Sequence, residues 1–331
     1  MSEVTIGVVG AAGRLGRLVV AALEADGAAV VAVDVRHASA VERADLLGAV
    51  DALVFTASVA DTSLHREAVE RGCHVVDVTV DRALNRELLA LDKLARDRRR
   101  CVVAMAGCAP GLTGVLAADM LDEFAAAGER VVVALIQSPT GTAGEDGTRE
   151  MLNMLTEPGV AYRGRPVQEA TGAVVPIRLF DLCNAEAEVS GLGAKLELAT
   201  GFDPARAHWQ LRALRGVRSI VPATYLRVRD PVARRKARTS GKREVTKLSA
   251  VAIDSEAKPM AGRLLTLASD YGATAAVAAA AATASAHGRL VPGAGHLLRF
   301  LTLGELLATP VVAATIDGDT GPVVAGGAPA L

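Results

Sequence analysis

Short apolar runs alternate with helical segments over the first 125 residues, and this alternation restricts the fold more than any other feature of the chain. Strands are predicted at residues 5–9, 29–35, 52–56, 75–78 and 101–106. Helices are predicted at residues 11–27, 63–71, 82–98 and 111–124, where apolar residues recur at helical spacing. Strands and helices that alternate in this way form a parallel sheet with right-handed crossovers. The sequence therefore predicts an α/β fold with a doubly wound parallel sheet.

The pattern changes near residue 129. Residues 131–137, 173–179, 194–199, 225–229 and 245–253 are strand-like, and a helix is predicted at 147–155. These segments predict a second α+β domain with a mostly antiparallel sheet. Helices return from residue 264, and the Gly- and Pro-rich residues 316–331 are expected to be loose. We therefore expect domains at residues 1–128 and 129–263, followed by helices and a tail at 264–331.

The charges of the chain almost cancel, since 36 Lys and Arg accompany 37 Asp and Glu. Such a chain has no overall field that attracts nucleic acid or an anionic membrane, and we expect neither as a partner. Basic residues do cluster between Arg227 and Arg243. Because no aromatic residues lie among them for base stacking, we interpret the cluster as a solvated hairpin tip rather than a phosphate or nucleic-acid patch.

Cysteine spacing and the apolar segments indicate the compartment. The four cysteines have no metal-ligand spacing, so we expect no metal site and a reducing environment. Glu3 and the lack of a basic region before the first apolar run argue against a signal peptide. The longest apolar stretch, residues 272–287, is shorter than the roughly 20 residues that a membrane-spanning helix needs. We expect a cytoplasmic protein.

The strongest local motif is a glycine turn between the first predicted strand and helix. Gly10 permits a tight turn, Gly13 lets the backbone approach a pyrophosphate, and Gly16 allows close packing of helix and strand. The start of the following helix offers free N–H groups to phosphates. The residues expected there are Ala12, Gly13, Arg14 and Leu15. With a strand before it and a helix after it, this turn predicts dinucleotide binding.

Residues 34–36 bear on which dinucleotide is bound. Asp34 ends the second predicted strand and would accept hydrogen bonds from a ribose diol, which favours NAD. Arg14 and Arg36 would pair with a 2′-phosphate, which favours NADP. The sequence predicts NAD or NADP and leaves the choice open.

Further candidates follow the ends of later strands, where open parallel sheets bind ligands. They are Thr56, Ala57 and Ser58, then Asp77, and then Gly107 and Cys108 in a Gly- and Pro-containing turn. Each has a structural alternative, with Asp77 as a loop acid and Cys108 as a small core residue. The cofactor-binding set expected is Gly10, Ala12, Gly13, Arg14, Leu15, Asp34, Val35, Arg36, Thr56, Ala57, Ser58 and Gly107.

The chain resembles the saccharopine dehydrogenase family of NAD(P)-dependent oxidoreductases. The resemblance rests on VGAAGRLG at residues 9–16, GCHVVDVT at 72–79 and AGCAPGLTGVLA at 106–117, with GEDGTREMLNML at 144–155 as a weaker match. The chain departs from the family pattern at Val76, Cys108 and Asp146.

The resemblance implies a Rossmann domain, a substrate domain, C-terminal helices that return to the first domain, and a homodimer. It also implies hydride transfer at a C–N or carbonyl centre of an amino-acid-like small molecule. We expect Asp77, beside the nicotinamide, to stabilise a protonated imine, with Cys108 as a further catalytic residue. Thr148 is expected to cap the helix that starts at Gly147 and to help bind a substrate carboxylate.

Two other functions remain open on the sequence. GAAGRLGR at residues 10–17 and SPTGTAG at 138–144 are similar to segments of dihydrodipicolinate reductases, although the paired histidines and lysine expected before the second segment are absent. The small number of acid and base residues at the site also allows a non-catalytic, dinucleotide-binding regulator.

Overall fold

The computed structural model describes residues 4–33, 45–124, 130–137, 145–156, 162–163, 167–168, 174–175, 179–181, 196–202, 206–239, 246–254 and 259–324. The chain divides into two compact units. Unit 1 comprises residues 1–115 and 271–315, and unit 2 comprises residues 116–270 and 316–331. Each unit is therefore built from two separate stretches of the chain.

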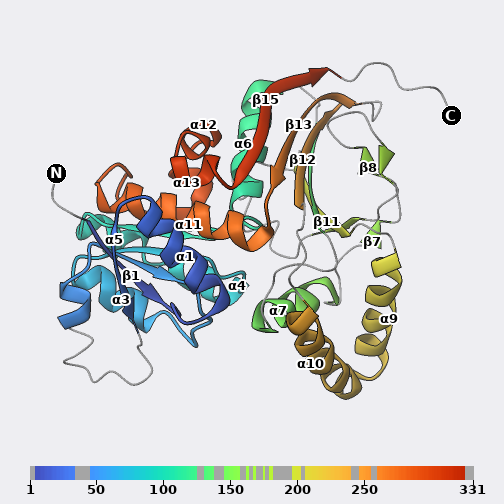
Figure 1. Ribbon diagram of the computed structural model, residues 1–331, viewed down its shortest axis with the longest axis horizontal. Coiled ribbons are helices and arrows are strands. Elements are labelled where there is room, and N and C mark those ends of the chain that lie inside the picture. Colours follow the sequence, from blue (N-terminus) through green and yellow to red (C-terminus); the bar gives the residue numbers. More distant parts are fainter. Residues whose placement is uncertain are drawn as a thin grey trace. The chain divides into compact units, whose positions relative to one another are not determined.

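Unit 1 contains a parallel sheet with helices packed around it (Figure 1). In the described residues this sheet has six strands in the order β14-β5-β4-β3-β1-β2. The order turns back at β1, which lies between β2 and β3, so the sheet is doubly wound as predicted. Its elements are β1 (Thr5–Val9), α1 (Arg14–Ala25), β2 (Ala29–Val33), β3 (Ala52–Phe55), α3 (Ser63–Glu70), β4 (His74–Asp77), α4 (Arg82–Leu89), α5 (Asp92–Asp97), β5 (Cys101–Ala104), α6 (Leu112–Phe124, which continues into unit 2), α11 (Asp270–Ala286), β14 (Gly293–His296), the 3-10 helix η2 (Leu297–Arg299), α12 (Leu303–Leu307) and α13 (Pro310–Ala313).

The central strands of this sheet are buried on both faces. Every residue of β3, β4 and β5 is buried, although successive side chains of a strand point to opposite faces. Continuous apolar runs such as Ala52–Phe55 and Cys101–Ala104 are typical of parallel strands covered on both sides. The sheet therefore forms the centre of the core of unit 1.

One edge strand of the sheet of unit 1, and the helix before it, come from the C-terminal third of the chain. β14 pairs with β5 in parallel, from Gly293 beside Cys101 to His296 beside Ala104. The preceding helix α11 is rich in alanine, and almost all of its residues from Ala273 to Ser285 are buried. Small side chains let this helix lie close to its neighbours on every side, so it acts as a core helix.

Unit 2 contains a mixed sheet in the order β15-β13-β12-β6-β11-β10-β7 and a small hairpin of β8 and β9, within the described residues. Pairs in the large sheet are antiparallel except β6 with β11, which agrees with the predicted mostly antiparallel sheet. Its elements are β6 (Arg130–Gln137), α7 (Glu145–Thr156), β7 (Tyr162–Arg163), β8 (Val167–Gln168), β9 (Val174–Val175), β10 (Leu179–Asp181), β11 (Leu196–Phe202), α9 (Arg206–Ile220), α10 (Pro222–Thr239), β12 (Thr246–Ile253), β13 (Pro259–Leu267) and β15 (Ile316–Val324).

The predicted strand at residues 225–229 is wrong, because these residues lie in helix α10. Tyr225 and Ala233 are buried and Arg229 between them is half-buried, so the inward positions recur every four residues. The basic cluster from Arg227 to Arg238 consequently lies on a helix, and the hairpin-tip interpretation is also wrong. Lys242 and Arg243 lie outside the described residues.

Two smaller expectations also need correction. The single helix predicted at 82–98 is two helices, α4 and α5, separated at Ala90 and Leu91. The tail expected to be loose instead forms strand β15 over Ile316–Val324, which pairs antiparallel with β13. The unpaired edge of β13 supplies backbone partners that local composition does not reveal.

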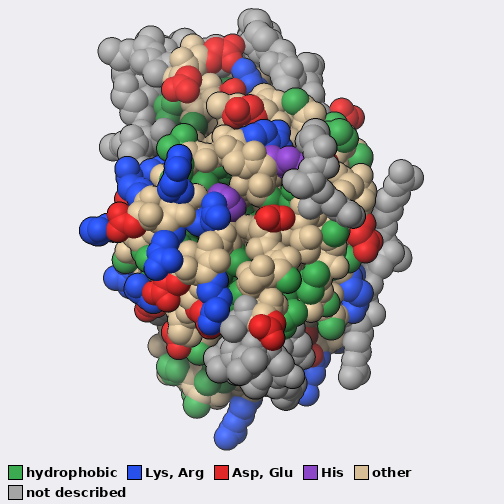
Figure 2. Space-filling model, turned by 90° about the vertical axis from the view of Figure 1, so that its left-hand side faces the viewer, with side chains coloured by type: hydrophobic (Ala, Val, Ile, Leu, Met, Phe, Trp, Pro, Cys, Tyr) green, Lys and Arg blue, Asp and Glu red, His purple; other side chains and the backbone are tan. Residues whose placement is uncertain are grey.

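Charged side chains of both signs are intermixed on the face shown in Figure 2. On α3 and α5 such side chains pair one helical turn apart, as in Lys93–Asp97 at 2.6 Å and Arg96–Asp92 at 2.8 Å. No described helix is long and apolar enough to cross a membrane. Among the described residues, no group of His, Cys, Asp and Glu side chains could hold a metal ion.

His74 makes the stability of the fold depend on pH. Its Nδ1 accepts a hydrogen bond from the Cys101 N–H at 3.1 Å, and burial, with Arg100 nearby, lowers the pKa of His74 to about 4. In the unfolded chain His74 takes up a proton near pH 6.5, whereas in the folded chain it stays neutral until about pH 4. The free energy of unfolding therefore falls as the pH falls from about 6.5 to about 4.

We expect this single group to remove up to about 3 kcal/mol of the free energy of unfolding over that pH range. His74→Asn keeps an acceptor for the Cys101 N–H but cannot titrate. Urea unfolding at pH 7.5 and pH 4.5 should show a smaller drop for the variant than for the natural chain. Equal drops in the two proteins would contradict the prediction.

Candidate functional site

The glycine turn joins β1 to α1 by very close backbone contacts. Gly10 has a φ of +83°, in the left-handed region, and the Gly13 N–H donates to its carbonyl oxygen at 2.8 Å. A Cβ atom on Gly16 would lie 2.0 Å from that same oxygen. Only glycine fits at residue 16, and its absence of a side chain lets the first turn of α1 rest on the end of β1.

The N-terminus of α1 is open to solvent. Gly13 is its N-cap, with extended backbone geometry, and no side chain caps the helix. The first turn holds no acidic residue, and Ala12 and Gly13 are exposed. Arg14 and Leu15 are half-buried beside them. The positive end of the helix dipole and the backbone N–H groups of the first turn would attract an anion at this point.

Thr56 holds the end of β3 against the turn. Its N–H and its hydroxyl both donate to the Val9 carbonyl oxygen, at 3.0 and 2.8 Å. A Cβ on Gly10 would lie 2.7 Å from the Ala57 Cβ, so the two segments touch. Ala57 and Ser58 are exposed. The structure thus brings Gly10, Gly13, Thr56 and Ala57 together where the strand order of the sheet turns back, which is where open α/β sheets bind ligands.

Three residues of the expected cofactor set, Asp34, Val35 and Arg36, lie outside the described residues. β2 is described to Val33, which pairs with Val9 at the end of β1. The part of the expected set that would contact a ribose therefore stays a prediction.

Asp77 forms a buried pair with His65 at the end of β4. Its Oδ2 lies 2.7 Å from the Nε2 of His65 on α3, and the side chains are 2% and 0% exposed. Its Oδ1 accepts from the Thr79 N–H at 2.6 Å, and its carbonyl oxygen accepts from the Ala106 N–H at 2.9 Å. Asp77 therefore connects α3, the segment after β4 and the segment after β5.

The imidazole of His65 is fixed from the other side by Phe55 of β3. The two rings stack with centroids 3.7 Å apart and planes at 17°. The Nδ1 of His65 is buried without a hydrogen-bond partner among the described residues. Sequence reasoning did not single out His65, although a lone histidine beside Ala68 and Val69 on the buried face of a predicted helix is a usable signal.

The turn at residues 107–111 is also tightly packed. A Cβ on Gly111 would lie 2.3 Å from the Gly107 carbonyl oxygen, and the φ of Gly111 is +126°. The Cys108 N–H donates to the Thr274 hydroxyl at 3.1 Å, and Cys108 is 2% exposed. Gly107 is buried too. Thr274 of α11 was not predicted as part of this region, because it is far away in sequence.

Thr148 lies in unit 2, and its expected capping role is wrong. Helix α7 includes Glu145, so Thr148 occupies the fourth described position rather than the N-cap. It is fully buried, and its hydroxyl has no hydrogen-bond partner among the described residues. A role in binding a substrate stays a prediction.

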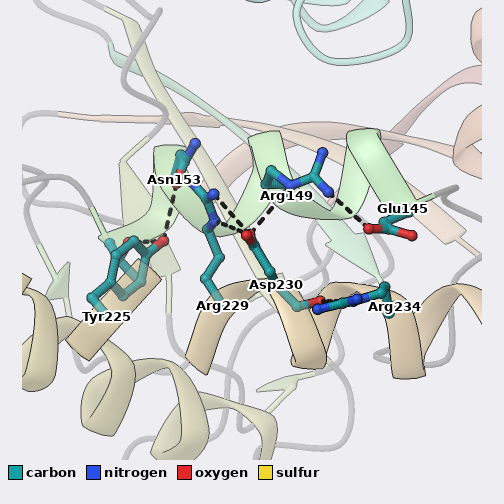
Figure 3. Close-up of polar contacts among 8 residues, drawn as sticks. Glu145, Arg149, Asn153, Tyr225, Arg229, Asp230 and Arg234 are labelled. Atoms are coloured by element: carbon teal, nitrogen blue, oxygen red, sulfur yellow. Dashed lines mark hydrogen bonds and ion pairs between the residues drawn. The ribbon is translucent and has the colours of Figure 1, made fainter. Parts of the chain in front are cut away.

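Charged and polar side chains of α7 and α10 point toward one another in unit 2 (Figure 3). Asp230 pairs with Arg229 at 2.7 Å and with Arg149 at 3.3 Å. The Arg229 guanidinium and the Tyr225 hydroxyl donate to the Asn153 Oδ1 at 3.0 and 3.2 Å. These bonds join the two helices and leave most of the charges of this cluster paired.

Comparisons with known proteins show the fold. No family model and no curated protein matches the chain. A meso-dapdh variant from Clostridium tetani E88, solved with DAP, is 13% identical with a TM-score of 0.50, and the match covers 92% of this chain and 96% of that chain. It shows that a Rossmann-type domain joined to a second α+β domain is the fold of this protein.

Two further solved structures are similar over most of the chain. An engineered D-amino acid dehydrogenase is 14% identical with a TM-score of 0.49, and the match covers 92% of this chain and 96% of that one. An amine dehydrogenase from Mycobacterium smegmatis is 10% identical with a TM-score of 0.43, and the match covers 91% and 97%.

We expect the His65–Asp77 pair to be strongly coupled, because removal of one partner leaves a buried polar group alone. In a double-mutant cycle with His65→Gln and Asp77→Asn, measured by urea unfolding, the coupling should be about 1–3 kcal/mol. The matched control is the exposed pair Lys93–Asp97, 88% and 58% exposed, with Lys93→Gln and Asp97→Asn. Its coupling should stay below about 0.5 kcal/mol. Equal coupling free energies in the two cycles would contradict the prediction that burial strengthens the His65–Asp77 interaction.

Proposed function

We propose that this protein is an NAD(P)-dependent oxidoreductase. The observation that carries the proposal is the open N-terminus of α1, where an exposed Gly13 caps the helix and Gly16 packs against Gly10. Backbone N–H groups in this position, at the turning point of a doubly wound sheet, suit the pyrophosphate of a dinucleotide.

The described residues fit such a cofactor. A side chain at Gly10 or Gly16 would collide with neighbouring backbone or with Ala57. Without side chains at these two positions, the backbone of the turn can lie close to a bound phosphate. When bound, a nicotinamide dinucleotide supplies or accepts a hydride at its ring. The residues from Gly13 to Leu15 would hold the phosphates, and Thr56, Ala57 and Ser58 would border the dinucleotide at the neighbouring strand end.

The choice between NAD and NADP remains open. Asp34 favours NAD by accepting hydrogen bonds from a ribose diol, whereas Arg14 and Arg36 favour the 2′-phosphate of NADP. Val35 lies between the two groups in sequence. The expected roles of residues 34–36 are part of the proposal.

We take the substrate to be an amino-acid-like small molecule with a C–N or carbonyl centre. The resemblance to saccharopine dehydrogenases supports this class, and the name of the similar C. tetani protein is compatible with it. Asp77 is 1% exposed and each of its carboxylate oxygens already accepts a hydrogen bond, so its effect on a protonated imine would act through space. Catalytic roles for Cys108 and Thr148, a homodimer and a cytoplasmic location are further parts of the proposal.

A second candidate function is a dinucleotide-binding regulator without catalysis. The observation that favours it is that Asp77 and Cys108, the expected catalytic groups of unit 1, are only 1% and 2% exposed. Binding without turnover would identify this function.

The cofactor proposal is tested by fluorescence titration with NADH and NADPH. Gly13→Ala places a methyl group on the exposed side of the turn, 3.1 Å from the Gly10 carbonyl oxygen, in a backbone conformation that alanine adopts. We expect at least about tenfold weaker binding, equal to about 1.4 kcal/mol. The free energy of unfolding should fall by no more than about 1 kcal/mol, since alanine is a poorer N-cap than glycine and its methyl group presses on the Gly10 carbonyl. Gly48→Ala, whose added Cβ meets no atom within 4 Å, is the matched control and should bind normally. If neither nucleotide binds at sub-millimolar concentration, the proposal fails.

Turnover separates the two candidate functions. Amines mixed with 2-oxo acids should cause loss of NADH or NADPH absorbance if the protein is an oxidoreductase of this type. A natural chain that binds a dinucleotide but consumes it with no substrate pair of this class would favour the regulator.

A further inference from the structure

Exposed large apolar side chains concentrate on the two helices α9 and α10 of unit 2, which follow one another in the chain (Figure 1). In the described part of the chain, such side chains elsewhere are Leu18 and Val291. Ile220 is 81% exposed, and Trp209, the single tryptophan of the chain, is 70% exposed. A concentration of this kind marks an interaction surface. The exposed large apolar side chains on the two helices and at their junction are Trp209, Ile220, Val221, Leu226, Val228 and Val232.

The same two helices are strongly basic. They carry ten Arg or Lys residues, four in α9 and six in α10, and one acid, Asp230. Their formal charge is therefore +9, although the whole chain carries −1. Asp230 is already paired with Arg229 and Arg149. The near balance of charge over the whole chain predicts no membrane partner, but it hides a strong local excess of positive charge.

Some of these arginines are available to a partner. Arg215, Arg227 and Arg234 form no ion pair with any residue that the structure describes. Arg227 and Arg234 are exposed and lie two helical turns apart on one side of α10. Leu226 and Val228, which are exposed too, flank Arg227. A guanidinium binds phosphate oxygens through two N–H groups, so α10 offers phosphate-binding groups next to apolar side chains.

The inner face of α9 is occupied by unit 2. Leu211 on this face is 6% exposed. The guanidinium of Arg218 donates to the Asn153 carbonyl oxygen at 2.6 Å and lies 5.3 Å from the centre of the Tyr225 ring. These contacts fix the orientation of α9, so its opposite face is held outward.

The outward face of α9 carries an apolar stripe that ends at the junction with α10. Trp209, Ala213, Gly216 and Ile220 follow one another at intervals of four, three and four residues, which places them along one side of the helix. The Arg212 guanidinium lies 5.3 Å from the centre of the Trp209 ring, at the edge of the stripe. Trp and other apolar residues on one side of a helix, with arginines beside them, are typical of helices that lie in a membrane interface.

We infer that α9 and the start of α10 bind the surface of an anionic membrane. Trp209, Ile220 and Val221 then enter the region between lipid headgroups and acyl chains. Arg227 and Arg234 contact the lipid phosphates and hold the negatively charged surface against the helices. The attachment is peripheral, since no described helix is long and apolar enough to cross a membrane.

Other partners suit one of the two features but not both. A nucleic acid would neutralise the arginines but would leave Ile220 and Val221 exposed to water. A second copy of the chain would cover the apolar side chains but would bring two helix pairs of like charge together. An anionic lipid surface accommodates the arginines and the apolar side chains at the same time.

The experiment mixes the full chain with vesicles of phosphatidylcholine, alone or with phosphatidylglycerol. Because Trp209 is the single tryptophan, its emission reports on this surface directly. We expect its emission to shift to shorter wavelength with phosphatidylglycerol vesicles, and binding to pure phosphatidylcholine to be at least about tenfold weaker. Binding should weaken between about 50 and about 500 mM NaCl, because salt screens the arginines. Lipids with brominated acyl chains should quench Trp209, since they quench only a ring that enters the membrane.

Two variants test the two kinds of contact. Ile220→Ser should weaken vesicle binding about tenfold, because an apolar side chain that enters the membrane is lost. Arg227→Gln combined with Arg234→Gln should weaken it at least about tenfold, because two phosphate contacts are lost.

The matched controls lie in unit 1 and should bind vesicles like the natural chain. Val291→Ser removes an apolar side chain that is 71% exposed. Arg66→Gln combined with Arg98→Gln removes two exposed arginines. Far-ultraviolet circular dichroism checks that each variant is folded.

The inference is overturned if the chain binds both kinds of vesicle equally or neither kind, or if the Ile220 and arginine variants bind as tightly as the natural chain. It is also overturned if duplex DNA binds while vesicles leave the Trp209 emission unchanged, or if that emission shifts with protein concentration but not with vesicles. These outcomes would assign the surface to a nucleic acid or to a second copy. Vesicle binding does not require a dinucleotide, so it can fail or succeed separately from the proposed function.

Discussion

The contact between Gly16 and the carbonyl oxygen of Gly10 is the constraint on which the candidate site depends. A single methyl group at residue 16 would lie 2.0 Å from that oxygen and would push α1 away from β1. Because helix and strand are this close, the N–H groups at the start of α1 face the turning point of the sheet, beside Thr56. The chemistry proposed for unit 1 therefore follows from the absence of a side chain rather than from a particular functional group.

Asp77 and His65 extend this rigid region toward the neighbouring strand ends. The pair is buried, stacked on Phe55, and bonded to backbone groups of two further segments. A buried charge is tolerated only when hydrogen bonds replace the lost water, and here both carboxylate oxygens have such bonds. The polar network thus orders the carboxyl edge of β3, β4 and β5.

Local patterns predicted what depends on local forces. The alternation of apolar runs and helices predicted the parallel sheet, and the positions of Gly10, Gly13 and Gly16 predicted the turn. Tyr225 to Arg229 misled the prediction, because the same alternation of apolar and basic residues also suits a helix in which Tyr225 and Arg229, one turn apart, both face α7. β15, the His65–Asp77 pair and the Cys108–Thr274 bond each join segments that meet only after folding, so the sequence alone could not locate them.

The position of β14 has a consequence for the order in which the protein is made. β5 leaves the ribosome early, but its parallel neighbour begins at Gly293, after the whole strand-rich part of unit 2 up to β13 has been synthesised. Until then one edge of the first sheet offers unpaired backbone groups to any strand that comes near. The Cys101–Ala104 edge can therefore pair with another strand until β14 is made, and a fragment that ends before β14 would keep this edge unpaired.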